Sequence, residues 1–161
     1  MIAVSKRLTC GDSTNGDFDP TGSLMAGDVV FENFVNPGGR PPLTVADLNM
    51  GGAGPMAAWH FLKVVLYVKP KITGMFTITV ISADQALAWV PSDKWGTTNL
   101  DISQWASRSI TINGCGERTS TRYFGGILAS DPNACIRLTV SESGGTSTKV
   151  QRRLNGDSCI G

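Results

Sequence analysis

The sequence has no excess of charge of either sign, so its overall charge alone indicates no partner. Its 161 residues carry 14 Lys and Arg against 13 Asp and Glu, so the net charge is +1. Dedicated nucleic-acid-binding domains commonly have an isoelectric point above about 9, whereas the value here is about 7.7. The overall charge therefore predicts no strong electrostatic steering toward any partner.

Long hydrophobic runs are also lacking. The longest apolar stretch, residues 61–68, is interrupted by Lys63, and a membrane-spanning helix needs about 18 apolar residues or more. Residues 1–7 are too few and too polar for a signal peptide, because their charged residues follow the apolar ones. We therefore expect neither a membrane span nor a signal sequence in this chain.

The common motifs of enzymes and metal sites are missing as well. The single histidine, His60, lies in line with Leu62 and Val64 on an apolar strand face, where a structural role is more common than catalysis. There is no Gly-x-Ser-x-Gly motif. The acidic segment 12–19 resembles a calcium loop, but Gly16 is its fifth residue and no Glu closes it. We predict no catalytic residue, no metal site and no cofactor.

The four cysteines do not form a metal-binding motif, because no Cys-x-x-Cys occurs and their spacings are long and irregular. Two disulfides in any of three pairings are possible. No Asn-x-Ser/Thr sequon is present, which favours a protein outside the eukaryotic secretory pathway. We expect reduced cysteines in an intracellular protein and keep two disulfides as the alternative. The residues concerned are Cys10, Cys115, Cys135 and Cys159.

Glycine and proline are abundant, with 19 and eight residues, which is typical of many short elements joined by turns. Alternation of apolar and polar residues predicts half-buried antiparallel strands at 75–81, 109–112 and 135–140. The Asn113-Gly114 pair after the second of these strands predicts a tight turn.

Residues 59–69 predict one long central strand with a nearly unbroken apolar face, about 35 Å in length. Weaker strands are expected at 28–35, 121–129 and 149–154. The predicted core residues are Leu62, Val64, Leu66, Phe76, Ile78, Val80, Ile136, Leu138 and Val140.

Long irregular segments separate the strands. Segment 36–55 is rich in Gly and Pro and holds one candidate helix at 44–48, capped by Thr44. Segment 83–104 is predicted to be irregular too. Because neither a repeat nor helix–strand alternation is visible, residues 1–161 are predicted to form one all-β domain, an antiparallel two-sheet sandwich.

The two ends of the chain, 1–21 and 143–161, are rich in Gly, Ser, Thr and Asp and are predicted to be extended arms. Several basic residues lie in these arms, where they either contact the phosphates of a polyanion or are merely solvated. These residues are Lys6, Arg7, Lys149, Arg152 and Arg153.

Trp89 and Trp95 fall in the predicted loop 83–104. Exposed rings there would suit stacking on sugars. We favour the alternative, in which they close one end of the sandwich or form a contact between subunits.

Between residues 59 and 140 the strands follow one another in a familiar order and spacing. They lie at 59–68, 74–81, 107–114, 121–129 and 134–140. A Gly/Pro-rich loop with a short helix precedes the first, and residues 130–133, Ser-Asp-Pro-Asn, join the last two. This order resembles that of the jelly-roll coat-protein domains of plant picorna-like viruses, the comovirus, nepovirus and cheravirus group (secoviruses).

The resemblance implies a jelly-roll topology and a coat-protein subunit without enzymatic activity. Such subunits assemble with other jelly-roll domains into an icosahedral shell around single-stranded RNA, in the virion and, during assembly, in the host cytoplasm. On this interpretation Trp89 and Trp95 are candidates for subunit contacts. The candidates for an RNA-facing surface are Lys6, Arg7, Arg152 and Arg153.

Neighbouring subunits would also cover the apolar residues that are scattered through the predicted loops and arms, since large exposed apolar patches mark interfaces. These are Leu24, Met25, Leu43, Val45, Leu48, Met50, Met56, Leu87, Trp89, Val90 and Trp95.

Two other classes of protein remain as alternatives. A secreted carbohydrate-binding β-sandwich would expose one of the two loop tryptophans in a groove, with disulfides such as Cys10–Cys159 and Cys115–Cys135. A sandwich hydrolase would need a pair of carboxylates in a cleft, which the sequence does not identify.

Overall fold

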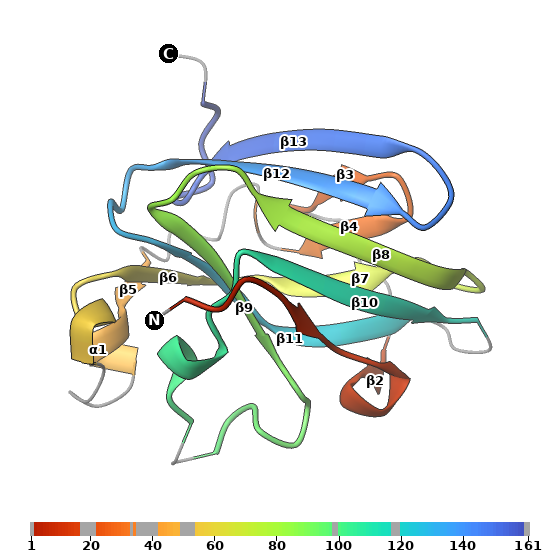
Figure 1. The fold of residues 1–161 in the computed structure, drawn as a ribbon, viewed down its shortest axis with the longest axis horizontal. Helices are drawn as coiled ribbons and strands as arrows, with labels where there is room; N and C mark the ends of the chain where they lie inside the picture. The colour runs from red at the N-terminus through yellow and green to blue at the C-terminus, as the bar shows by residue number, and fades with distance from the viewer. Residues whose placement is uncertain are drawn as a thin grey trace.

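Two β-sheets packed face to face make up the molecule (Figure 1). The computed structural model describes residues 2–16, 22–32, 34, 42–48, 54–97, 100–116 and 120–159. The two-sheet, all-β sandwich predicted from alternation is confirmed. In the described part of the chain, no helix has the length and apolar character needed to cross a lipid bilayer.

The five-stranded sheet has the order β1-β10-β8-β12-β13. Its strands are β1 (Lys6–Arg7), β8 (Thr73–Val80), β10 (Ser109–Cys115), β12 (Cys135–Glu142) and β13 (Ser147–Arg153). All of its pairings are antiparallel except that of β1 with β10.

The eight-stranded sheet has the order β3-β4-β7-β11-β6-β5, and β2 and β9 also pair with β11. Its strands are β2 (Thr14–Asn15), β3 (Leu24–Ala26), β4 (Val29–Glu32), β5 (Leu43–Thr44), β6 (His60–Lys63), β7 (Val65–Val68), β9 (Gln85–Val90) and β11 (Thr121–Ala129). The short helices are η1 (Cys10–Asp12), α1 (Val45–Leu48), η2 (Gly54–Met56) and η3 (Ile102–Trp105).

The strands from β7 to β12 pass alternately from one sheet to the other. β8 pairs with β10 in one sheet, and β7 pairs with β11 in the other. These pairs are nested in sequence around β9, which itself pairs with β11 in the eight-stranded sheet. The next strand, β12, pairs with β8 and with the following strand β13, while β4 pairs with β7.

The main core lies between the two sheets, and the alternation of the sequence identified its members correctly. Side chains at every second position of a strand point to the same face, so the apolar half of each strand is buried. None of the predicted core residues is more than 5% exposed, namely Leu62, Val64, Leu66, Phe76, Ile78, Val80, Ile136, Leu138 and Val140.

The single long strand predicted at 59–69 is wrong, because β6 and β7 are separated at Val64. The Val64 N–H donates to the carbonyl oxygen of Gly125 at 3.0 Å. Its own carbonyl oxygen accepts a hydrogen bond from the Trp89 indole at 2.8 Å. This carbonyl is therefore held by a side chain from another strand at the point where the ladder is interrupted.

Segment 83–104 is not wholly irregular, since it contains β9, which pairs with β11. All six residues of β9 are buried, and a strand covered on both faces shows a continuous apolar run instead of alternation. One face of β9 joins the main core, and the other joins a second core together with η3. The second core contains Val45, Met56, Phe61, Ala86, Ala88, Val90, Ile102, Ala106 and Leu128.

The turn predicted at Asn113-Gly114 is also wrong, because both residues lie within β10, where they pair with Met75 and Gly74. A Cβ atom at position 114 would overlap the carbonyl oxygen of Ile72. Glycine is therefore required here for a close backbone approach and not for a turn.

The weaker predictions agree with the described residues. β11 has the predicted bounds 121–129, while β13 begins at Ser147, earlier than predicted. α1 is capped as expected, since the Thr44 hydroxyl accepts a hydrogen bond from the Asp47 N–H at 3.1 Å. Parts of the predicted strand 28–35 and of segment 36–55, including Met50, lie outside the described residues.

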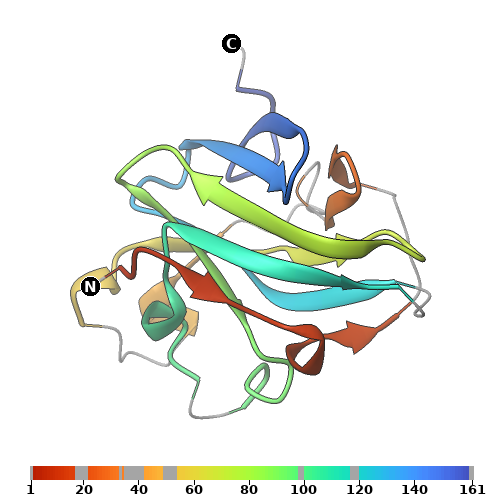
Figure 2. The ribbon, with the colours of Figure 1, turned by 45° about the vertical axis from the view of Figure 1, so that its right-hand side comes forward.

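Both ends of the chain contact the sandwich in their described parts. β1 lies beside β10, and β13 forms a hairpin with β12 (Figure 2). Disulfides join Cys10 to Cys115 and Cys135 to Cys159, so all four cysteines of the chain are bonded. The expectation of reduced cysteines is therefore wrong for this structure, and so are the pairings Cys10–Cys159 and Cys115–Cys135. Each end is bonded to the strand end that it reaches by β-pairing.

Candidate functional site

The basic residues predicted to face RNA lie at opposite edges of the five-stranded sheet. Lys6 and Arg7 form β1 at one edge, whereas Arg152 and Arg153 end β13 at the other. Four steps between neighbouring strands, each about 4.8 Å, separate these edges by about 19 Å. The fold therefore does not gather the four residues into one cluster.

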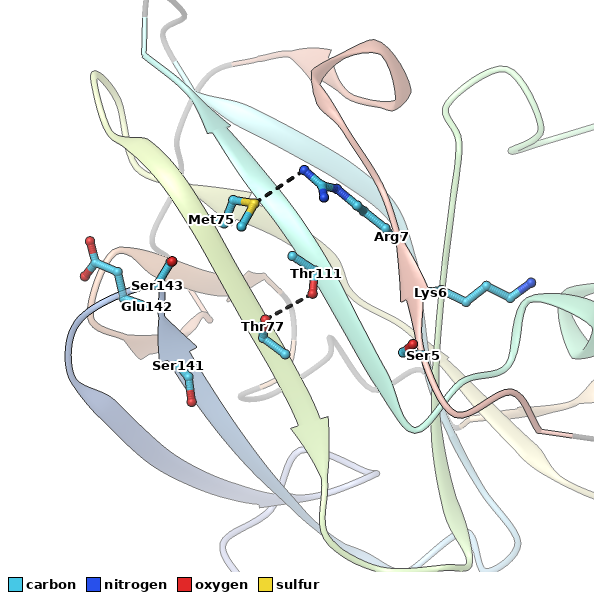
Figure 3. Close-up of a pocket in the computed structure, with 9 residues that line it drawn as sticks. All are labelled: Ser5, Lys6, Arg7, Met75, Thr77, Thr111, Ser141, Glu142 and Ser143. Atoms are coloured by element: carbon cyan, nitrogen blue, oxygen red, sulfur yellow. Dashed lines mark hydrogen bonds between the residues drawn. The ribbon is translucent and has the colours of Figure 1, made fainter.

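A hollow of about 530 Å³ lies on this sheet beside β1 (Figure 3). Polar residues of β1, β8, β10 and the end of β12 surround it, and no aromatic ring lines it. The lining residues are Ser5, Lys6, Arg7, Met75, Thr77, Thr111, Ser141, Glu142 and Ser143.

Arg7 is the basic residue directed across this hollow. Its guanidinium crosses β10 and donates a hydrogen bond to the Met75 sulfur at 3.4 Å (Figure 3). A thioether sulfur is a weak acceptor, so this contact positions the guanidinium without neutralising it. In the described part of the chain, no carboxylate forms an ion pair with Arg7.

Lys6 lines the hollow, but its charged end does not lie beside the Arg7 guanidinium. Its Nζ lies over the Trp105 ring, 5.1 Å from the ring centre, and its side chain points away from Thr77 and Thr111 (Figure 3). Attraction to the ring face favours this arrangement. Lys6 therefore contributes charge near the rim of the hollow and no direct contact to its floor.

Paired hydroxyl groups form the floor of the hollow and continue beyond it. The hydroxyls of Thr77 and Thr111 are 3.0 Å apart (Figure 3), and the Thr79 and Ser109 hydroxyls are 3.2 Å apart. Both pairs join β8 to β10, because these residues lie opposite each other in the ladder and on the same face. The polar halves of the two strands thus form one row of hydroxyls.

Glu142 is the only carboxylate among the lining residues of the hollow. It follows Ser141 at the end of β12, on the far side of β8 from Arg7, and its side chain points away from Arg7 (Figure 3). The charge of the hollow is therefore divided, with the cation at the β1 side and the anion at the β12 side.

At the other edge of the sheet, Arg152 and Arg153 are only partly available to a ligand. Arg152 is half-buried and lies opposite Ile136 in the ladder. The Arg153 Nε donates to the carbonyl oxygen of Ser158 at 3.1 Å, which leaves its remaining N–H groups for other acceptors.

The two tryptophans that were predicted to form subunit contacts differ in position and exposure. The prediction that Trp89 lies in a loop is wrong, because it lies in β9. Its side chain is only 1% exposed and belongs to the main core. Trp95 is half-buried in the segment that follows β9. Its ring stacks on Phe124 with 6.3 Å between ring centres, and the Lys63 Nζ lies 5.6 Å from its centre. Trp95 therefore remains a candidate for contact with a partner.

The surroundings of Trp95 include a second basic group. The Arg122 guanidinium lies 5.1 Å from the Phe124 ring centre. Nearby, burial raises the pKa of the Tyr67 phenol above its usual value of 10.0, and a hydrogen bond with Arg122 opposes this shift. The raised pKa favours the neutral phenol at neutral pH.

The described residues offer no metal centre, since they contain no group of three or more His, Cys, Asp and Glu side chains that could hold an ion. In the segment whose sequence resembles a calcium loop, the Asp12 carboxylate accepts a hydrogen bond from the Thr9 N–H at 2.8 Å. His60 is half-buried on β6, opposite Thr44 and Ala129 in the ladders.

Sequence reasoning missed the contribution of Arg137 and singled out Lys149 only as an arm residue. Both are exposed and lie on the same face of the sheet as Thr77, at alternating positions of β12 and β13. The alternation of Arg137 with buried Ile136 and Leu138 was the available signal.

Comparison with known proteins adds no assignment to this geometry. No family model, no curated protein and no solved structure matches the chain. The interpretation of function therefore depends on the fold and on the surfaces described above.

Proposed function

We propose that this chain is a structural subunit of an icosahedral virus shell around single-stranded RNA and that it catalyses no reaction. Its partners are other coat-protein subunits, and its place is the virion and, during assembly, the host cytoplasm. The nested pairing of β7 with β11 and of β8 with β10 supports the proposal, because jelly-roll sandwiches with nested strand pairs are used by viral coat proteins.

The observation that carries the proposal is the position of two exposed apolar side chains. Met25 on β3 is 46% exposed and Leu43 on β5 is 51% exposed. Both β3 and β5 are edge strands on the side of β6 and β7 that faces away from β11, since β3 lies beyond β4, which pairs with β7, and β5 pairs with β6. Exposed apolar side chains on edge strands are suited to contacts with neighbouring subunits, and a shell requires such contacts.

The proposal does not depend on all the apolar loop residues that were expected to be exposed. That expectation is wrong for Val45, Met56, Leu87, Trp89 and Val90, which are at most 5% exposed. Leu87 and Trp89 belong to the main core, and the other three belong to the second core. Leu24, Leu48 and Trp95 are half-buried.

The test is assembly. Electron microscopy and sedimentation of native source material should show particles that contain the chain. In recombinant protein, Met25→Lys and Leu43→Lys should each prevent assembly while the circular dichroism spectrum is unchanged. Ile81→Lys is the matched control, since Ile81 is 58% exposed but follows β8 in the other sheet. A chain that stays monomeric in its native source contradicts the proposal.

A secreted carbohydrate-binding module is the second candidate, and the half-buried Trp95 ring outside the strands favours it, since such a ring can stack on a sugar. This candidate predicts no free thiol in denatured protein from its native source, and polysaccharide binding that Trp95→Ala abolishes. Four free thiols would exclude it and would agree with assembly in a reducing cytoplasm.

A further inference from the structure

The outer face of the five-stranded sheet carries cations and hydroxyls at its alternating strand positions, and the carboxylate that borders it in the hollow is Glu142, whose side chain points away from Arg7 (Figure 3). Alternation places this outer face opposite the buried face of Phe76, Ile78 and Val80. We call this surface the hydroxyl face. It consists of Arg7, Ser109, Thr111, Asn113, Thr73, Met75, Thr77, Thr79, Arg137, Thr139, Ser141, Ser147, Lys149, Gln151 and Arg153.

The cations of this face keep donors for a ligand. In the described part of the chain, the Arg7 guanidinium has the Met75 sulfur as its sole hydrogen-bond acceptor. Arg137 is exposed and makes one long hydrogen bond, 3.4 Å from its Nε to the Gln151 side-chain oxygen. Lys149 is exposed as well. An anion that reached these groups would not have to displace an existing ion pair.

The hydroxyl pairs add donors between the cations. In the Thr77–Thr111 pair one hydroxyl donates to the other, so the accepting hydroxyl keeps its own O–H for an outside acceptor. The Thr79–Ser109 pair, which lies two residues further along each strand, likewise keeps one O–H for an outside acceptor. A row of single O–H donors beside guanidinium groups is suited to the oxygens of phosphate groups.

The lining of the hollow indicates which kind of polyanion fits. Sugar-binding and base-stacking sites present aromatic rings, and no ring lines this hollow. Contacts from Arg, Lys, Ser and Thr to the sugar–phosphate backbone need no ring and do not depend on base sequence. The chemistry therefore favours a nucleic-acid backbone over an uncharged polysaccharide.

We propose that the hydroxyl face binds the phosphate backbone of single-stranded RNA, independently of sequence, with Arg7 in the hollow at one end and Arg137, Lys149 and Arg153 toward the other. This inference rests on the proposed shell function and names the surface that faces the RNA. It replaces the predicted set of Lys6, Arg7, Arg152 and Arg153, of which only Arg7 and Arg153 belong to this face.

The salt dependence of binding gives the sharpest test. Each phosphate neutralised on a single strand contributes about −0.7 to the slope of log K against log salt concentration, so four cations predict a slope of about −2.8. The Kd of a fluorescein-labelled oligouridylate, measured by anisotropy, should therefore rise about 50-fold between about 50 and 200 mM salt. With Arg7→Gln or Lys149→Gln the rise should fall to about 18-fold.

Two further variants separate charge at this face from charge in general. Lys94→Gln removes an exposed cation outside the hydroxyl face and should leave the slope at the wild-type value. Arg7→Lys keeps the charge and should restore the slope that Arg7→Gln loses. Thermal unfolding of each variant should be unchanged, because Arg7, Lys94 and Lys149 are exposed.

Absence of oligouridylate binding at about 50 mM salt, or an equal loss of slope in Lys94→Gln, would overturn the inference. Tighter binding of a sulfated polysaccharide than of oligouridylate would overturn it too and would assign the face to carbohydrate. Shells that assemble from a chain without RNA affinity would contradict this inference alone. RNA binding by a chain that never assembles would contradict the shell function and leave the binding surface standing.

Discussion

Removal of the Cys10–Cys115 disulfide should cost the protein more stability than removal of the Cys135–Cys159 disulfide. The first bond joins residues 105 apart in sequence and the second joins residues 24 apart. A cross-link stabilises a fold by limiting the unfolded chain, and the loop-entropy relation gives about 4.8 kcal/mol for the longer loop and about 3.4 kcal/mol for the shorter. The two loops do not overlap in sequence, so the costs should add.

Urea unfolding of paired Cys→Ser variants measures these costs. With an m-value of about 2 kcal/mol/M, the midpoint should fall by about 2.4 M without Cys10–Cys115 and about 1.7 M without Cys135–Cys159. Loss of both bonds should remove about 8 kcal/mol, which is most of the stability of an ordinary domain. Wild-type protein in reductant should then unfold at the midpoint of the variant that lacks both.

Two results would refute this reasoning. If reductant leaves the wild-type midpoint unchanged, the bonds do not form in the folded protein. If the variant without Cys135–Cys159 is the less stable of the two, loop entropy does not set the order of the two costs, and native contacts around Cys159 contribute more than the length of the closed loop.

Three further changes test the fold. Gly126→Ala should destabilise the protein by about 3 kcal/mol in urea unfolding, since its Cβ would overlap the Leu62 carbonyl oxygen. Gly145→Ala should change stability by less than about 0.5 kcal/mol, since its Cβ would make only ordinary contacts with Glu142, at 3.8 Å or more. Val64→Asp buries an unpaired charge in the main core and should abolish the cooperative unfolding transition; a well-folded variant would contradict the strand register. The raised pKa of the Tyr67 phenol contributes stability that is fully present below pH 10.0, its usual pKa, and that is lost as pH rises through the pKa of the folded state. The stability of Tyr67→Phe to urea should therefore fall less in alkali than that of the wild type. Identical pH profiles for the two proteins would contradict this expectation.

The alternation of apolar and polar residues predicted those strands that have one face toward solvent. In β8, buried Phe76 and Ile78 alternate with half-buried Thr77 and Thr79, and this period of two is visible in the sequence. β9 escaped prediction because both of its faces are covered, so Ala86 to Val90 show no period. A short stretch of sequence shows how apolar its residues are, but not whether other parts of the chain cover one face of the strand or both.

The candidate site was harder to predict than the core, because it depends on which strands become neighbours. The Arg7 contact with Met75 joins residues 68 positions apart, and it exists because β1 docks against β10. Nothing local to residues 1–21 indicates that pairing. Likewise, Trp89 and Trp95 look equivalent in sequence, yet one supports the core and the other is half-buried outside β9.

The position of β11 affects how the protein can be synthesised. Four strands pair with it, β2, β6, β7 and β9, and all of them precede it in the chain. At about 5–20 residues per second, a ribosome needs about 6–23 s to pass from Thr14, where β2 begins, to Ala129, where β11 ends. Until then the nascent strands lack their common partner, and their apolar faces stay open to chaperones or to neighbouring nascent chains. The eight-stranded sheet therefore cannot be completed before β11 has been synthesised.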